Sequence, residues 1–228
     1  MLRKILGVGA VTLFAGLAVA GCSPVKMGAA AVVGNQRVTV ANLDTEAGML
    51  TSAVKPYTTV VTLTPTQITQ ETLGWLIRFK INEQLASQQG ITVTSAQAEA
   101  ALNEIYAEGK SQAAQAGIAK ATNDLILVAN GIAPNLATEL GRFQAIEDQF
   151  LKGLNGGKIP TNTTTLNTDE GKLTHAQCLA AKSLNIKVNP QFGRLDYSNY
   201  SVVATADTVS RPAGTVQAAS KTGLTPAC

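Results

Sequence analysis

The residues that could support catalysis gather around Cys178, which follows the only histidine of the chain by three positions. On a helix, His175 and Cys178 would share one face, where an imidazole and a thiolate could act as base and nucleophile. A helix start favours the thiolate but disfavours a charged histidine, and the sequence offers no third group to orient the pair. We therefore interpret His175 as solvated and Cys178 as structural, and we predict no enzyme activity.

Other patterns that bind metals, phosphates or substrates are weak. The single histidine excludes a His-based metal site, and the sequence contains no Gly-rich phosphate loop and no G-x-S-x-G nucleophile elbow. The acidic pairs Asp44/Glu46 and Glu147/Asp148 do not share one helical face closely, so we expect them to be solvated surface. The sequence therefore predicts no metal, no cofactor and no small-molecule substrate.

The amino-terminal segment carries chemistry of another kind. Arg3 and Lys4 precede an uncharged, mostly apolar run over residues 5–20, and Val19-Ala20-Gly21-Cys22 resembles the lipobox of bacterial lipoprotein signals. This resemblance implies cleavage before Cys22 and attachment of a diacylglycerol to its thiol. An ordinary transmembrane anchor and a secreted protein with a chance cysteine are the alternatives, although the apolar run is short for a span.

A lipid anchor would set the compartment of the mature protein. We expect a signal peptide at residues 1–21, a tether at residues 22–30, and a location on the extracytoplasmic face of the cell membrane. Thiols outside the cytoplasm tend to pair, so we expect a Cys178–Cys228 disulfide, the alternative being two unpaired thiols. Two basic residues of the +3 net charge belong to the signal, so the mature chain is nearly neutral. This balance argues against nucleic acid as a partner.

Turn and capping patterns predict a β-hairpin followed by helices. β-Branched residues flank Gly34-Asn35, a pair suited to a tight turn, and Thr39 can cap the next helix. The capping box Thr64-Pro65-Thr66-Gln67 predicts a helix to about Gln89, which carries the only tryptophan and which we expect at the centre of the core. Similar patterns predict helices after Thr94, over residues 119–129, and from Pro134 to Leu151.

The last third of the chain is predicted to be less regular. Residues 153–172 contain Gly156-Gly157, Pro160 and several threonines, a composition typical of a linker. A further Thr-x-x-Gln box at Thr174 predicts a helix to about Leu184, followed by a short strand at residues 186–188. Residues 197–228 are rich in Ala, Thr and Ser, so we expect a largely disordered tail.

Three segments together resemble the SurA/PrsA/PpiD family of extracytoplasmic chaperones and foldases. Residues 31–39 resemble the opening hairpin of that family, with glycine before asparagine in place of the usual order. Residues 89–94, with Ala98-Glu99 after them, are similar to the family's turn into its next helix. Residues 188–196 resemble the closing motif, with Gln191 where Arg is common and Leu195 where Trp is common.

The resemblance implies a mainly α fold, a helical SurA-like chaperone cradle over residues 31–196. In that family a small N-terminal β-hairpin is joined by a strand from the far end of the chain. Prolyl isomerase domains, where present, are inserted at the position of residues 153–172. Twenty residues are too few for such a domain, so the resemblance implies a holding module without isomerase activity.

The implied partners are the membrane, through the N-terminal lipid, and unfolded secreted polypeptides. Binding would be passive and apolar, because the sequence has no ATP motif. The candidate client-binding side chains are Met49, Tyr57, Trp75, Phe79 and Tyr106, although amphipathic stripes more often belong to the core. The alternative function is a scaffolding lipoprotein that binds one folded envelope partner.

Overall fold

The computed structural model describes residues 28–205 and Cys228. Residues 1–21, Cys22 and most of the predicted tether lie outside the described residues, as does the segment 206–227 of the predicted tail. The described residues form six α-helices and two small antiparallel sheets, so the mainly helical fold class is confirmed. None of these described helices is long and apolar enough to cross a membrane.

The predicted hairpin is present, and a strand from the other end of the chain joins it. β1 (Ala29–Val33) pairs with β2 (Gln36–Thr39), and β3 (Lys187–Val188) pairs antiparallel with β1, with Ala31 opposite Val188. Gly34 adopts a φ of +61°, and its N–H donates to the Leu184 carbonyl at 2.6 Å. A Cβ atom at position 34 would meet only the end of the flexible Leu184 side chain, so the positive φ is the main reason for glycine in this turn.

The helices begin and end largely where the capping patterns place them. Thr39 caps α1 (Val40–Val54), which a 3₁₀ turn (Lys55–Tyr57) follows. Full capping boxes open α2 (Pro65–Gln89) and α3 (Ser95–Gln115), and Gly90 ends α2 in the left-handed conformation. The remaining helices before the predicted linker are α4 (Asn123–Ala129), a 3₁₀ turn (Pro134–Leu136) and α5 (Ala137–Leu154).

The linker predicted over residues 153–172 is wrong for most of its length. α6 (Thr163–Ser183) begins inside it, with the Asn162 side chain accepting hydrogen bonds from the N–H groups of Thr164 and Thr165 at 3.0 and 3.2 Å. The expected helix start at Thr174 is therefore wrong, and its hydroxyl instead donates to the Glu170 carbonyl within the helix. Threonine is a poor helix former, but Leu166 and Leu173 give this segment an apolar face to bury.

The predicted disorder from residue 197 is also wrong for its first part. β4 (Arg194–Asp196) and β5 (Ser201–Val203) form an antiparallel pair in which Leu195 and Val202 are buried. This pair lies against α2 at Gly74, where the backbone of residues 200–202 comes close to the helix. The chain is therefore ordered beyond residue 196, where the segment that resembles the SurA/PrsA/PpiD family ends, because Val202 in β5 is buried.

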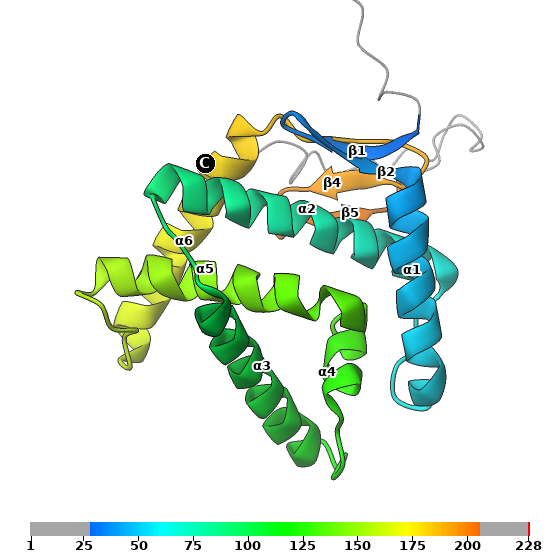
Figure 1. Cartoon of the computed structure of the whole chain (residues 1–228), viewed down its shortest axis with the longest axis horizontal. Coiled ribbons are helices and arrows are strands. Elements are labelled where there is room, and N and C mark those ends of the chain that lie inside the picture. Colours follow the sequence, from blue (N-terminus) through cyan, green and yellow to red (C-terminus); the bar gives the residue numbers. More distant parts are fainter. Residues whose placement is uncertain (1–27, 206–227) are drawn as a thin grey trace, which may run out of the picture.

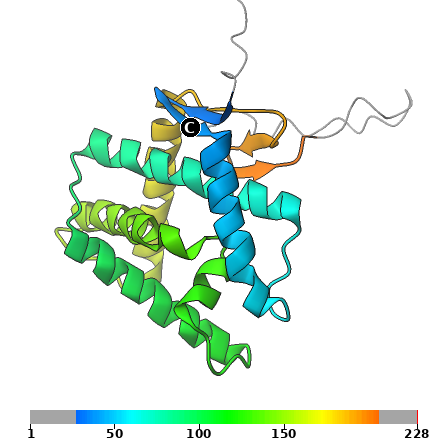
Figure 2. The same cartoon turned by 45° about the vertical axis from the view of Figure 1, so that its right-hand side comes forward.

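Two buried clusters share α2, which runs between the β1–β2 sheet and α5 (Figure 1). In the turned view, α1 crosses α2 (Figure 2). The hairpin cluster combines residues of both sheets and of α6 with one side of α2, at Leu73, Ile77, Ile81 and Leu85. The helical cluster combines α1, α4 and the start of α5 with another part of α2, including Ile68 and Phe79. The prediction that α2 is central to the core is confirmed.

Candidate functional site

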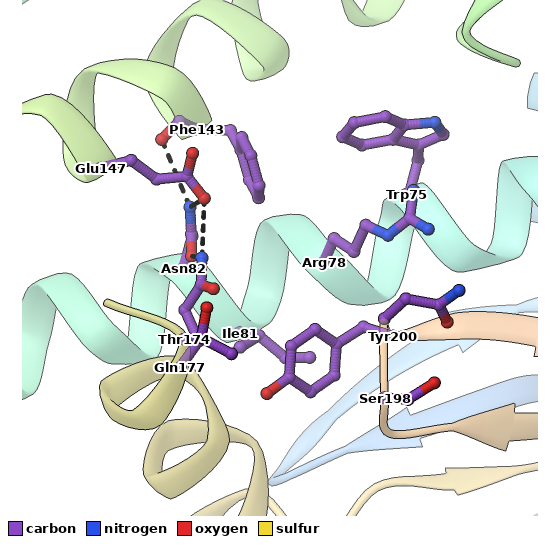
Figure 3. Close-up of a pocket in the computed structure, with 11 residues that line it drawn as sticks. Trp75, Arg78, Ile81, Asn82, Phe143, Glu147, Thr174, Gln177, Ser198 and Tyr200 are labelled. Atoms are coloured by element: carbon purple, nitrogen blue, oxygen red, sulfur yellow. Dashed lines mark hydrogen bonds between the residues drawn. The ribbon is translucent and has the colours of Figure 1, made fainter. Parts of the chain in front are cut away.

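A pocket of about 300 Å³ lies where α2, α5 and α6 meet the turn between β4 and β5 (Figure 3). Its aromatic walls come from Trp75, Phe143 and Tyr200. Its ionisable groups include Arg78 on α2 and Glu147 on α5. A second hollow of about 340 Å³ between α3 and α5 has no aromatic wall. The first pocket is therefore the candidate site.

A hydrogen-bonded network joins three helices at one side of this pocket. The Gln177 amide donates to Glu147 Oε1 at 2.7 Å and to Asn82 Oδ1 at 2.9 Å. The Asn82 amide donates to the Phe143 carbonyl at 3.3 Å and to Glu147 Oε1 at 3.4 Å. Asn82 is only 1% exposed, and this network provides partners for its buried amide. The network therefore fixes the Glu147 carboxyl group in place.

Glu147 has a strongly altered acidity. Burial raises its pKa to about 7, the neighbouring charge of Asp148 adds to the increase, and the hydrogen bonds from Gln177 and Asn82 oppose it. A carboxyl group with this pKa exchanges its proton near neutrality. The expectation that Glu147 is solvated surface is therefore wrong, because α6 covers it.

Arg78 is held against an aromatic face at the other side of the pocket in Figure 3. Its guanidinium carbon lies 4.7 Å from the centre of the Trp75 ring, a cation–π arrangement. The Trp75 indole N–H donates to the Asn130 carbonyl at 2.9 Å, and its ring meets Phe143 edge-on at 5.7 Å. Burial lowers the pKa of Arg78 and the charge of Glu71 opposes this, but a guanidinium stays charged. The pocket therefore contains an oriented cation.

Tyr200 completes the pocket from the β4–β5 turn. Its φ of +54° is rare for a bulky side chain and places backbone strain at the pocket wall. The turn is fixed by Asn199, whose side chain accepts from the Ser201 N–H at 3.1 Å and from its hydroxyl at 2.6 Å. Burial raises the pKa of the Tyr200 phenol, so it remains a neutral hydrogen-bonding group.

The structure does not gather the five predicted client-binding residues into one surface. Trp75 lines the pocket, but Phe79 is 8% exposed within the helical cluster. Tyr57 and Tyr106 are half-buried against the same cluster, and the Tyr57 hydroxyl is hydrogen-bonded to that of Thr122 at 2.7 Å. Met49 is 51% exposed on α1. Most of the five candidate client-binding side chains therefore pack in the helical cluster.

Cys178 on α6 forms a disulfide with Cys228. The expected pairing is present, and it occupies the sulfur that a thiolate–imidazole pair would need. His175 is exposed in the middle of α6, so the argument from a helix start does not apply to it.

Sequence reasoning did not single out Arg78, Asn82, Gln177 or Tyr200. One available signal is Asn82, a polar residue between the apolar Ile81 and Leu85 on a helix expected to be buried. Comparison of the chain with models of protein families, with curated proteins and with solved structures finds no match in any of the three. The pocket combines an aromatic surface, an oriented guanidinium and a carboxyl group whose pKa is raised to about 7.

Proposed function

We propose that this protein is a lipid-anchored, extracytoplasmic chaperone module that holds non-native secreted polypeptides and does not isomerise prolines. The observation that carries the proposal is the pairing of β3 with β1, which brings residues 187–188 beside residues 31–32. A strand that returns from the far end of the chain to the opening hairpin is what the resemblance to the SurA/PrsA/PpiD family implies. The proposal includes a cradle for the unfolded client that is formed by the helices.

Apolar surface supports the holding role. The pocket presents Trp75, Phe143 and Tyr200, and Met49 and Val60 each leave 51% of their surface exposed. Such surfaces bind extended apolar segments by removing them from water, and they require no nucleotide. A pocket of this size accepts about one side chain at a time, which suits transient binding of many sequences.

Aggregation of an unfolded client tests the proposal. The lipidated mature protein, residues 22–228, in nanodiscs is expected to slow light scattering by a reduced, unfolded secretory protein, whereas empty nanodiscs are not. Proline isomerisation in a model peptide should keep its uncatalysed rate. Unchanged aggregation at a several-fold excess of the protein over client would contradict the proposal.

A matched pair of exposed substitutions locates the effect. Met49→Ser removes a predicted contact from α1, and Leu154→Ser removes an apolar side chain of similar exposure, 43%, from the end of α5. The first is expected to weaken holding more than the second, with both variants folded by circular dichroism. Capture of a single stoichiometric protein from membranes, in place of many clients, would favour the scaffolding alternative.

A further inference from the structure

Arg78 is an oriented cation that forms no ion pair with the described residues, although the charge of Glu71 acts on it. The ion pairs in residues 28–205 are Lys80–Glu83 and Lys172–Asp169, and neither involves Arg78. Its guanidinium donates no hydrogen bond to any side chain or carbonyl of the described part of the chain, yet it lines the pocket and is held over Trp75. A planar group with five N–H donors, half-buried in the protein, therefore faces a cavity with donors that a ligand could engage in place of solvent.

We propose that the pocket binds a carboxylate attached to an apolar or aromatic group, with Arg78 as the anion partner. The guanidinium fork matches a carboxylate in two parallel hydrogen bonds, a geometry that a point charge does not provide. The stacking on Trp75 holds the fork in orientation before the ligand arrives, which reduces the cost of ordering it. Trp75, Phe143 and Tyr200 would cover the apolar part of the ligand.

Glu147 makes this binding depend on protonation. Its ionised form would repel a carboxylate in the same pocket, so binding should favour the neutral form and take up a proton. Arg78 from α2 and Tyr200 from the β4–β5 turn are the other ionisable groups of the pocket lining, while α6 contributes only Thr174 and Gln177. Asp148 acts on Glu147 from α5. With a pKa of about 7, Glu147 makes proton uptake possible near neutrality.

The size of the pocket limits the ligand to about one amino-acid residue, because about 300 Å³ is at the lower end of small-molecule sites. The carboxylate could belong to the free C-terminus of a polypeptide with an apolar last residue or to a small free molecule of the same chemistry. The inference goes beyond the proposed holding function, since such a site would select one end of a chain in place of any apolar segment.

The single tryptophan of the chain provides the measurement, because Trp75 forms the pocket wall beside Arg78. The lipidated mature protein, residues 22–228, in nanodiscs is titrated with N-acetylphenylalanine and with its uncharged amide while Trp75 fluorescence is recorded. The carboxylate is expected to bind at least about tenfold more tightly than the amide, since a hydrogen-bonded charge contributes more than a neutral group. Equal affinities, or no saturable change with either compound, would overturn the proposal.

Two variants separate anion binding from a structural effect. Arg78→Gln should abolish the preference for the carboxylate, and Arg78→Lys should retain part of it, with folding checked by circular dichroism. From about pH 8 to about pH 6, wild-type affinity for the carboxylate should increase roughly threefold to tenfold, whereas Glu147→Gln should show no increase. A carboxylate preference that persists in Arg78→Gln would overturn the assignment of Arg78.

Peptides distinguish the two ligand sources. A short peptide ending in a free phenylalanine carboxylate is compared with the same peptide ending in an amide. Stronger binding of the free end supports a polypeptide terminus, and binding of N-acetylphenylalanine alone supports a small carboxylate. The aggregation assay is run in parallel. If the protein binds the carboxylate but does not slow client aggregation, only the chaperone proposal is contradicted. If it slows aggregation but does not bind the carboxylate, only the carboxylate site is contradicted.

Discussion

The hairpin cluster and the helical cluster differ in how much chain separates the residues that meet in them. The hairpin cluster brings Ala31 of β1 together with Ala180 of α6 and Val202 of β5. The helical cluster takes its buried residues from the continuous stretch between Leu50 and Leu140. Long-range contacts require closure of long loops before they stabilise the fold. We therefore expect the hairpin cluster to depend more than the helical cluster on covalent links such as the disulfide.

The largest expected effect on this difference comes from the disulfide. Cys228→Ser opens a link across a sequence separation of 50 residues, which is expected to lower the free energy of unfolding by about 4 kcal/mol. The loop that it closes contains β3, β4 and β5. Hydrogen exchange should therefore accelerate in these strands and much less in α4. Cys178→Ser should give the same pattern, and uniform acceleration in both clusters would contradict the comparison.

Gly141 tests the helical side, where α5 packs closely on α3. A Cβ atom at this position would overlap the backbone carbonyl of Ala98, which cannot move like a flexible side chain. Gly141→Ala is therefore expected to lower the free energy of unfolding by about 3 kcal/mol in denaturant titration. The matched control is Gly153→Ala in the same helix, which meets no atom within 4 Å and should stabilise by about 0.5–1 kcal/mol.

Glu147 is expected to make stability depend on pH. Its folded-state pKa of about 7 lies above the ordinary value of 4.5, so the native state retains a proton that the unfolded chain loses between these values. Stability should then be highest at the acidic end of this window and fall by about 2–3 kcal/mol as the pH rises through it. Glu147→Gln keeps the hydrogen-bonding shape and should remove this fall. A fall that persists in the variant would assign it to another group.

The smallest expected effect tests the helix that the two clusters share. Thr64→Ala removes the cap of α2 and should cost about 1 kcal/mol, with faster exchange in both clusters. Thr94→Ala removes the equivalent cap of α3 and should affect the helical side alone. Thr66→Ala is the control, since Thr66 is exposed and should tolerate the change. Equal exchange patterns for the two cap variants would contradict a shared α2.

The local features of the fold were predictable because short-range chemistry determines them. The turn at Gly34-Asn35, the boxes at Thr64 and Thr94, and the stop at Gly90 each depend on residues within a few positions of one another. The start of α6 was not predictable in this way. Its threonine-rich first turns have weak intrinsic preference, and contacts made by Leu166 and Leu173 with distant residues decide their conformation.

The sequence by itself determined the caps at Thr39, Thr64 and Thr94, the turn at Gly34-Asn35 and the availability of two cysteines that could pair. Only the tertiary structure decided which polar side chains became a site. Glu147 and Asp148 are adjacent, but α6 covers Glu147, so burial raises its pKa, while the hydrogen bond from Gln177, which comes from another part of the chain, opposes the increase. Tertiary packing likewise orients the Arg78 guanidinium over the Trp75 ring and places both residues in the pocket lining. Burial and charge depend on neighbours in space, which local patterns do not specify.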